Sequence, residues 1–291
     1  DGALIRSEGA FNDCSALREV NFPSATSIGN CAFSNCTALQ EVNLPSVTSI
    51  GSCAFYGCSV LQKVCVPCIT TLGGLVFVNC KALQTMELLN VTSIFKLTFL
   101  NCTALQQVVA PNLQSFGDAF VNCSALQELD ISNYSGKASC FQYLKNTPSL
   151  ETIRIAQDNA KYAVQDGVVL TKDLQSIVYM APKNPIKNID LPQVTRLEDR
   201  VFADCTNLET ISLPNVTCIG DEAFDKCARL KEVRISDRGP QLTIGAKAFN
   251  KCRRLTGLLI DGSYENLWPK LQVDETAMDP LTHVRLMFPV T

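Results

Sequence analysis

Cysteine is the residue type with which this sequence could do the most chemistry. The 291 residues include 15 cysteines but a single histidine, His283. Thiolates bind soft metals and exchange disulfides, whereas many zinc sites and the Ser/His or Cys/His nucleophiles need imidazole. Because 15 is odd, at least one thiol is unpaired within the chain, which is not typical of a small disulfide framework. With one histidine close to the carboxyl end, histidine-dependent catalysis is not indicated.

Nine of the cysteines occupy one position of a recurring motif, Phe-x-x-Cys-x-x-Leu. They are Cys14, Cys36, Cys58, Cys80, Cys102, Cys123, Cys205, Cys227 and Cys252. Such an array could bind metal or be redox-active, or it could be a ladder of reduced thiols that act as small apolar side chains. Thr147 and Met278 take this position in less regular copies, and both are poor replacements for a required thiolate. We therefore expect a buried, reduced ladder.

The other six cysteines give weaker indications of chemistry. They are Cys31, Cys53, Cys65, Cys68, Cys140 and Cys218. Cys65 and Cys68 have the two-residue gap of redox and zinc pairs, but no second Cys-x-x-Cys accompanies them. Cys31 and Cys53 stand at identical positions of adjacent repeats, so either a disulfide or two reduced neighbours fits. We expect no metal and no cofactor.

The motif sets a period of about 22 residues along the chain. Its leucine position falls at residues 17, 39, 61, 83, 105, 126, 150, 186, 208, 230, 255 and 281. Apolar residues three and five positions after most of these alternate with other residues and predict a short strand, often followed by proline. The preceding Ala-Phe-x-x-Cys-x-x-Leu segment predicts a short helical turn, which the Asn before several of the cysteines would end.

The predicted fold is an α/β solenoid, because one such unit cannot bury its own apolar face and the copies must stack. We expect about 12 repeats of about 22 residues, with a parallel β-sheet on one face and short helices on the other. Two β-rich runs, 162–170 and 175–179, predict a β-hairpin near 160–181. The single domain then divides into N-terminal repeats (1–155), the hairpin insert (156–185), C-terminal repeats (186–260) and an atypical last repeat or cap (261–291).

The repeat resembles the unit of the BspA-like class of leucine-rich repeat proteins, Ser/Thr-x-Ile-Gly-x-x-Ala-Phe-x-x-Cys-x-x-Leu-x-x-Val-x-Leu-Pro. From Ser49 to Cys58 the chain reads Ser-Ile-Gly-Ser-Cys-Ala-Phe-Tyr-Gly-Cys, and the likeness extends over essentially residues 4–291. The resemblance implies a hairpin insert in mid-array. It also implies a bacterial protein at the cell surface or secreted, often adhesive or host-interacting.

The composition restricts the classes of partner. With 46% hydrophobic residues, 18% charged residues and a net charge of −3, the sequence is too apolar for a disordered chain and lacks the basic excess of a nucleic-acid-binding protein. No apolar run reaches the roughly 18 residues of a membrane span, and residues 1–6 lack the pattern of an export signal. We expect a monomer that binds no nucleic acid and has no membrane span in this chain.

The outward face of the strands, two and four positions after each leucine, is the candidate binding surface. In the central repeats it carries Glu128, Asp130, Thr152, Arg154, Asn188 and Asp190. Breaks in a repeat array often map to binding, and the irregular stretch 132–181 holds four of the six tyrosines. These are Tyr134, Tyr143, Tyr162 and Tyr179. The tyrosines could provide contact area for a ligand, or they could seal the hairpin onto the solenoid.

The predicted function is non-catalytic recognition of a protein or glycan on another cell or matrix. The sequence contains no nucleophile-elbow, phosphate-loop, zinc-helix or calcium-loop pattern that would indicate an enzyme. Two alternatives stay open. One is a spacer that holds another module away from a cell surface, and the other is a glycan hydrolase that uses a carboxylate pair such as Glu128 and Asp130.

Overall fold

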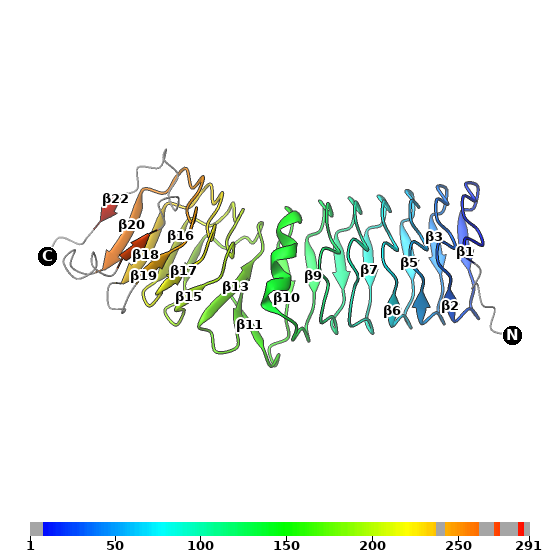
Figure 1. Ribbon diagram of the computed structural model, residues 1–291, viewed down its shortest axis with the longest axis horizontal. Helices are drawn as coiled ribbons and strands as arrows, with labels where there is room; N and C mark the ends of the chain where they lie inside the picture. Colours follow the sequence, from blue (N-terminus) through cyan, green and yellow to red (C-terminus); the bar gives the residue numbers. More distant parts are fainter. Residues whose placement is uncertain (1–7, 237–241, 262–270, 274–284, 288–291) are drawn as a thin grey trace. The chain divides into compact units, whose positions relative to one another are not determined.

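The chain forms two compact units, residues 1–159 and 160–291, which we call the first and the second unit. The computed structural model describes residues 8–236, 242–261, 271–273 and 285–287. Each unit is a stack of turns, and each turn corresponds to one repeat of the sequence (Figure 1). The repeat architecture with parallel strands predicted from the 22-residue period is therefore confirmed. The boundary between the units, after residue 159, lies inside the predicted insert 156–185.

One side of the first unit consists of three-residue parallel strands, one from each turn. These strands are β1 (Glu19–Asn21), β3 (Glu41–Asn43), β5 (Lys63–Cys65), β7 (Thr85–Glu87), β8 (Gln107–Val109), β9 (Glu128–Asp130) and β10 (Thr152–Arg154). The register between neighbours is one repeat, so that Val20 pairs with Val42 and Val42 with Val64. In β3 the central Val42 is buried while Glu41 and Asn43 are exposed. This alternation confirms that positions two and four after the leucine face outward.

Shorter strands form a second parallel sheet further along each of the first turns. They are β2 (Ser27–Ile28), β4 (Ser49–Ile50) and β6 (Thr71–Leu72), and their Ile or Leu is buried. Gly51 follows β4 where two turns pass close to each other. A Cβ atom at Gly51 would lie 2.6 Å from the backbone nitrogen of Asn30, which explains why the repeat has glycine after its isoleucine.

The segment Phe-x-x-Cys-x-x-Leu folds into hydrogen-bonded turns, which corrects the prediction of short helices on the second face. In one turn Cys36 N donates to Phe33 O and Leu39 N donates to Cys36 O, at 3.3 and 3.0 Å. Cys31 and Asn35 have positive φ angles of 52° and 58°, so a right-handed helix cannot run through them. The described helical residues of the chain are those of a single 3-10 helix, η1 (Ala138–Asn146).

The asparagine before the cysteine ends the turn in the left-handed conformation, as predicted from its position. Asn79, Asn101 and Asn122 have φ angles of 60° or 61°. Their side chains also form a ladder, because Asn101 donates to Asn79 and Asn122 donates to Asn101, each at 2.9 Å. Asparagine tolerates this conformation better than most residues, since its short side chain forms local hydrogen bonds.

The core of the first unit is a column of phenylalanine rings with the cysteine ladder beside it. Consecutive rings from Phe33 through Phe55 and Phe77 to Phe99 stack with centroids 5.4 to 5.6 Å apart. Each buried ladder thiol of this unit donates to the phenylalanine carbonyl one repeat earlier, as in Cys58 Sγ to Phe33 O at 3.1 Å. Eight of the nine ladder cysteines are buried and Cys14 is exposed. The ladder therefore packs as part of the core, as expected for apolar, reduced thiols.

The second unit begins with an antiparallel meander. Its strands are β11 (Tyr162–Gln165), β12 (Val168–Thr171) and β13 (Ser176–Met180). The predicted hairpin is present, and the run 162–170 is itself a hairpin whose turn at Asp166 and Gly167 has positive φ at both residues. Asn184 Nδ2 donates to Gly167 O at 3.0 Å and fixes this turn.

Two parallel sheets complete the second unit. From β13 one sheet continues through β15 (Arg196–Leu197), β17 (Cys218–Ile219), β19 (Leu242–Ile244) and β21 (Leu271–Val273). The other contains β14 (Asn188–Asp190), β16 (Thr210–Leu213), β18 (Glu232–Ser236), β20 (Gly257–Asp261) and β22 (Arg285–Met287). The predicted last repeat around Leu281 and His283 lies outside the described residues.

Replacing a ring inside the column should destabilise the protein far more than replacing an exposed ring. Phe77 is fully buried between Phe55 and Phe99, whereas Phe95 is 58% exposed. We expect Phe77→Ala to lower the free energy of unfolding by about 3–5 kcal/mol and Phe95→Ala to change it by less than about 0.5 kcal/mol. Urea denaturation followed by circular dichroism measures both values. Equal effects of the two substitutions would contradict the assignment of the column as core.

The buried ladder should make the protein sensitive to alkali. Burial raises the pKa of the Cys58 thiol from an ordinary 9.0 to about 12, and that of Cys123 also to about 12. At pH values between 9.0 and about 12, these thiols lose their protons in the unfolded chain and keep them in the folded chain. The free energy of unfolding therefore falls as the pH rises. The loss is about 1.4 kcal/mol per pH unit for each such thiol.

Cys58→Ala isolates this contribution. Between pH 10 and pH 11 its free energy of unfolding should fall by about 1.4 kcal/mol less than that of the unsubstituted protein. Denaturant titrations at the two pH values provide the comparison. If the two proteins lost stability equally, the ionisation of Cys58 would not be coupled to unfolding.

Candidate binding face

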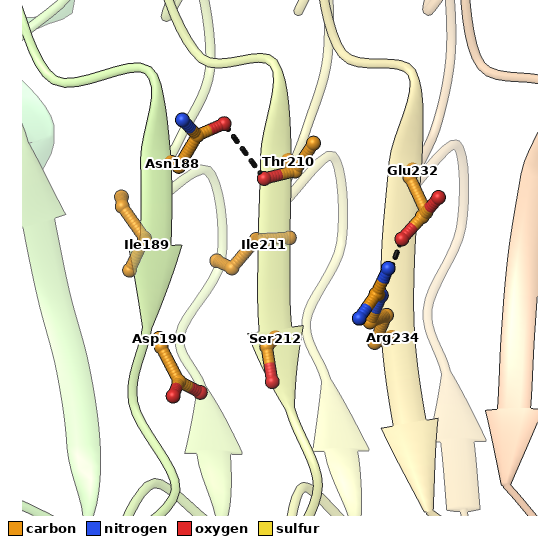
Figure 2. Close-up of a pocket in the computed structure, with 8 residues that line it drawn as sticks. All are labelled: Asn188, Ile189, Asp190, Thr210, Ile211, Ser212, Glu232 and Arg234. Atoms are coloured by element: carbon orange, nitrogen blue, oxygen red, sulfur yellow. Dashed lines mark hydrogen bonds and ion pairs between the residues drawn. The ribbon is translucent and has the colours of Figure 1, made fainter.

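A shallow depression lies on the outward face of β14, β16 and β18 in the second unit. Its volume is about 410 Å³. The residues around it are Asn188, Ile189, Asp190, Thr210, Ile211, Ser212, Glu232 and Arg234. Figure 2 shows the polar members as two rows that cross the three strands, one row near the start of each strand and the other two residues further on. Ile189 and Ile211 are buried beneath these rows.

Strand register produces the two rows. Asn188 pairs with Thr210 and Thr210 with Glu232, while Asp190 pairs with Ser212 and Ser212 with Arg234. Each residue stands two or four positions after a leucine-slot residue, at 186, 208 or 230, and the 22-residue spacing brings equivalent positions side by side. Neighbouring strands are about 4.8 Å apart, which places adjacent side chains within reach of one small polar group.

Part of this face is internally paired. Thr210 Oγ1 donates to Asn188 Oδ1 at 2.8 Å, and Arg234 Nε forms an ion pair with Glu232 on the same strand. These contacts hold the side chains of the first row and of Arg234 in place. The amide nitrogen of Asn188 remains able to donate to a ligand.

Asp190 and Ser212 form the uncommitted part of the face. Asp190 is exposed and Ser212 is half-buried. Within the described part of the chain, neither side chain has a hydrogen bond or an ion pair. A carboxylate and a hydroxyl at neighbouring positions thus offer three acceptor oxygens and one donor that folding does not use.

An ion-pair ladder borders the depression, one residue before the strands. Glu209 accepts from Lys231, and its other carboxylate oxygen lies 3.9 Å from Lys187 Nζ. The hydrogen bond from Lys231 and its charge lower the pKa of Glu209. These three side chains neutralise one another in large part, so this edge adds only a weak positive field.

In the first unit the predicted site residues mostly bind one another. The Glu128 carboxylate forms an ion pair with Arg154 on the next strand and accepts from Gln107 on the previous one. Asp130 accepts from Ser132 N and Oγ at 3.0 and 2.6 Å, at the end of its own strand. Thr152 is exposed beside Glu128. The carboxylates of Glu128 and Asp130 are therefore both bound by neighbouring side chains of the first unit.

The tyrosines need a correction, because three of the four are buried. Tyr134 packs edge-on against Phe141 with its ring centroid 5.3 Å away, and its hydroxyl donates to Lys137 O at 2.8 Å. Tyr162 and Tyr179 are buried in β11 and β13. Tyr143 in η1 is 42% exposed. A buried ring offers no contact area, so Tyr134, Tyr162 and Tyr179 are left out of the binding face.

The cysteines outside the ladder divide by exposure. Cys65 and Cys68 are exposed, whereas Cys31, Cys53, Cys140 and Cys218 are half-buried, and all 15 cysteines are free. Among the residues that the structure describes, no three cysteine, histidine, aspartate or glutamate side chains gather as metal ligands would. The same residues include no helix long and apolar enough to cross a membrane.

Comparison with known proteins identifies the repeat. A family model described as BspA type leucine-rich repeat region, with six copies, matches residues 5–127, 69–166 and 172–268. The chain belongs to the BspA-type leucine-rich repeat family. Curated proteins give no match.

Solved structures of leucine-rich repeat proteins share the fold of this BspA-type chain. A leucine rich cell surface protein from Faecalibacterium prausnitzii is 24% identical with a TM-score of 0.61, covering 94% of this chain and 80% of its own. A leucine-rich repeat protein from Bacteroides ovatus is 22% identical with a TM-score of 0.58, covering 97% and 77%. The pneumococcal vaccine antigen PcpA is 18% identical with a TM-score of 0.60, covering 94% and 75%. At these identities the likeness concerns the fold.

Sequence reasoning named Asn188 and Asp190 as site residues but did not select the four polar residues that complete the depression. These are Thr210, Ser212, Glu232 and Arg234. The signal was present in the spacing, since the leucine positions 186, 208 and 230 are each 22 residues apart.

Two aspartates at the same repeat position, Asp130 and Asp190, should differ in how much they contribute to the free energy of unfolding. Asp130 accepts two hydrogen bonds from Ser132, whereas Asp190 accepts none from the described residues. We expect Asp130→Ala to lower the free energy of unfolding by about 1–2 kcal/mol and Asp190→Ala to change it by less than about 0.5 kcal/mol. Urea midpoints of the two variants check this. A larger cost for Asp190→Ala would mean that Asp190 serves the fold and is not free for a ligand.

Proposed function

We propose that this chain is a non-catalytic binding module that recognises a partner on the outward face of β14, β16 and β18. The observation that supports this most directly is the depression whose Asp190 and Ser212 are left unpaired by folding, whereas Asp130 and Arg154, at the same repeat position in β9 and β10, bind Ser132 and Glu128. Polar groups that the fold does not use, held at fixed spacing on a sheet, are suited to form hydrogen bonds with a partner.

The chemistry of the depression favours a polar protein segment over a glycan. Its lining includes two carboxylates, a guanidinium, an amide and two hydroxyl groups, but none of its eight residues is aromatic and able to stack on a sugar ring. Since Arg234 pairs with Glu232, the remaining charge is that of Asp190. A segment that presents a lysine or arginine to Asp190, with backbone groups opposite Ser212 and Asn188, matches this set.

A location at the cell surface fits this role. One similar structure is that of a leucine rich cell surface protein, and another is that of a pneumococcal vaccine antigen. The proposal is thus a secreted or surface-exposed bacterial module that contacts a protein on another cell or in the extracellular matrix. The proposed module needs no catalytic step, and the carboxylates considered for one, those of Glu128 and Asp130, are engaged with neighbouring residues.

The whole chain is first used to probe an array of extracellular-matrix proteins and glycans, which identifies the partner. Two double variants then locate the binding site. We expect Asp190→Asn with Ser212→Ala to weaken binding by about 10- to 100-fold, because the partner's polar groups lose their hydrogen bonds. Glu87→Gln with Thr85→Ala on β7 is the matched control in the first unit, and it should leave the dissociation constant unchanged. Surface plasmon resonance measures both.

The alternatives give different results in the same experiment. Binding that neither double variant affects would place the site elsewhere. A chain that binds nothing on the array would support the role of a spacer. Binding to glycans alone would overturn the choice of a protein segment.

A further inference from the structure

Two partly exposed thiols, those of Cys31 and Cys53, occupy the same position in neighbouring turns of the first unit. Both cysteines are free and half-buried. Both have positive φ angles, 52° and 57°, so their backbone conformations match. Cys31 N donates to Ser52 O and Cys53 N donates to Gly74 O, each at 2.9 Å, so each cysteine has the same relation to the turn that follows it.

The hydrogen bonds on both sides fix the spacing between the two cysteines. Before them, Ser27 pairs with Ser49 and Ile28 with Ile50 in the parallel sheet of β2 and β4. After them, Phe33 N donates to Ala54 O at 2.8 Å. Parallel segments bonded in this way lie about 4.8 Å apart. Disulfides join Cα atoms that are about 4.4–6.8 Å apart, so the spacing suits a bond between these turns.

The two thiols influence each other. Burial, and after it the neighbouring Cys31 side chain, raise the pKa of the Cys53 thiol. At the one-turn spacing set by the backbone hydrogen bonds, one thiol is close enough to attack a mixed disulfide on the other.

The other cysteines of the first unit lack this combination of spacing and exposure. Ladder thiols have the same one-turn spacing, but Cys58 and its buried neighbours donate to carbonyl groups of the preceding turn. Cys65 and Cys68 are exposed, but they belong to the same turn and lie at the end of β5 and just after it. Cys31 and Cys53 are both accessible to an oxidant, and each has the other thiol beside it.

We propose that Cys31 and Cys53 form a reversible disulfide that links two successive turns. The oxidant is a low-molecular-weight disulfide. A thiolate of the pair attacks it, forms a mixed disulfide and releases one small thiol, and the second thiolate then attacks the protein sulfur and releases the other. The protein loses two protons and two electrons, and the small disulfide becomes two thiols.

The bond closes a loop of 22 residues and restricts the unfolded chain. It should therefore raise the midpoint of thermal unfolding by roughly 5 °C. Dithiothreitol should restore the original midpoint. Cys53→Ala should show no such shift under the same oxidation.

The decisive measurement is mass spectrometry of the oxidised protein. The whole chain is incubated with oxidised glutathione, the remaining thiols are blocked with N-ethylmaleimide after unfolding, and the digest is analysed. We expect a peptide pair joined through Cys31 and Cys53, two hydrogens lighter than its parts, with Cys58 and Cys80 blocked by N-ethylmaleimide.

A shifted pair serves as the matched control for geometry. Leu75 has the same position in the next turn, with a φ angle of 61° and partial exposure. In Cys31→Ala with Leu75→Cys, the cross-link should move to positions 53 and 75. Glutathione adducts on both Cys31 and Cys53 without a bond between them would overturn the proposal. A mixture of cross-links that included Cys65 and Cys68 equally would overturn it as well.

Discussion

Within each unit, successive described turns are held to each other by hydrogen bonds, and the rest of the structure depends on that register. On the turn side, amides of Cys31, Phe33 and Asn35 donate to carbonyl groups one repeat later. Near the strand the amide of Gln40 donates to Arg18, one repeat earlier. Since apolar side chains are buried only between turns, no repeat has a complete core of its own. The 21-residue repeat keeps this pattern, because Phe99 N still donates to Ala119 O.

The same register determines which side chains of the outward face pair with each other and which remain available to a ligand. Side chains at equivalent positions stand about one strand spacing apart, so complementary neighbours pair with each other. Asn43 donates to Asn21, and Arg154 binds Glu128. Where neighbours do not bond to each other, as with Asp190 and Ser212, the polar groups remain for a partner. The binding capacity of such a sheet therefore resides in unpaired neighbours more than in any single residue type.

The sequence period predicted the strands and the outward positions, because the leucine spacing determines which residues become neighbours, and two β-rich runs predicted the hairpin. It did not predict the turns, since apolar residues three apart fit a helix and a series of i to i+3 turns equally well. Asparagine at residue 35 indicates a left-handed residue, but cysteine at 31 and leucine at 75 do not, and tertiary hydrogen bonds impose that conformation on them.

The candidate site was only partly predictable for a related reason. Tyr134 lies eight residues after Leu126, the position of the buried Val47 relative to Leu39, so the repeat frame held the signal that it is buried. The amphipathic side chain of tyrosine by itself suggests a contact residue, and for Tyr134 that suggestion is wrong. The depression depends on side-chain size and pairing across three strands, and no single-repeat pattern contains that information.

The asparagine ladder has a practical consequence for how the protein is produced. Asn101 and Asn122 are followed by Cys-Thr and Cys-Ser, which makes both of them acceptors for N-linked glycans in a eukaryotic secretory pathway. A sugar on the Asn122 amide would occupy the nitrogen that donates to Asn101 and place a bulky group against the stacked turns. Expression hosts that do not glycosylate asparagine preserve the ladder, whereas a glycosylating host would yield molecules that differ in turn packing from copy to copy.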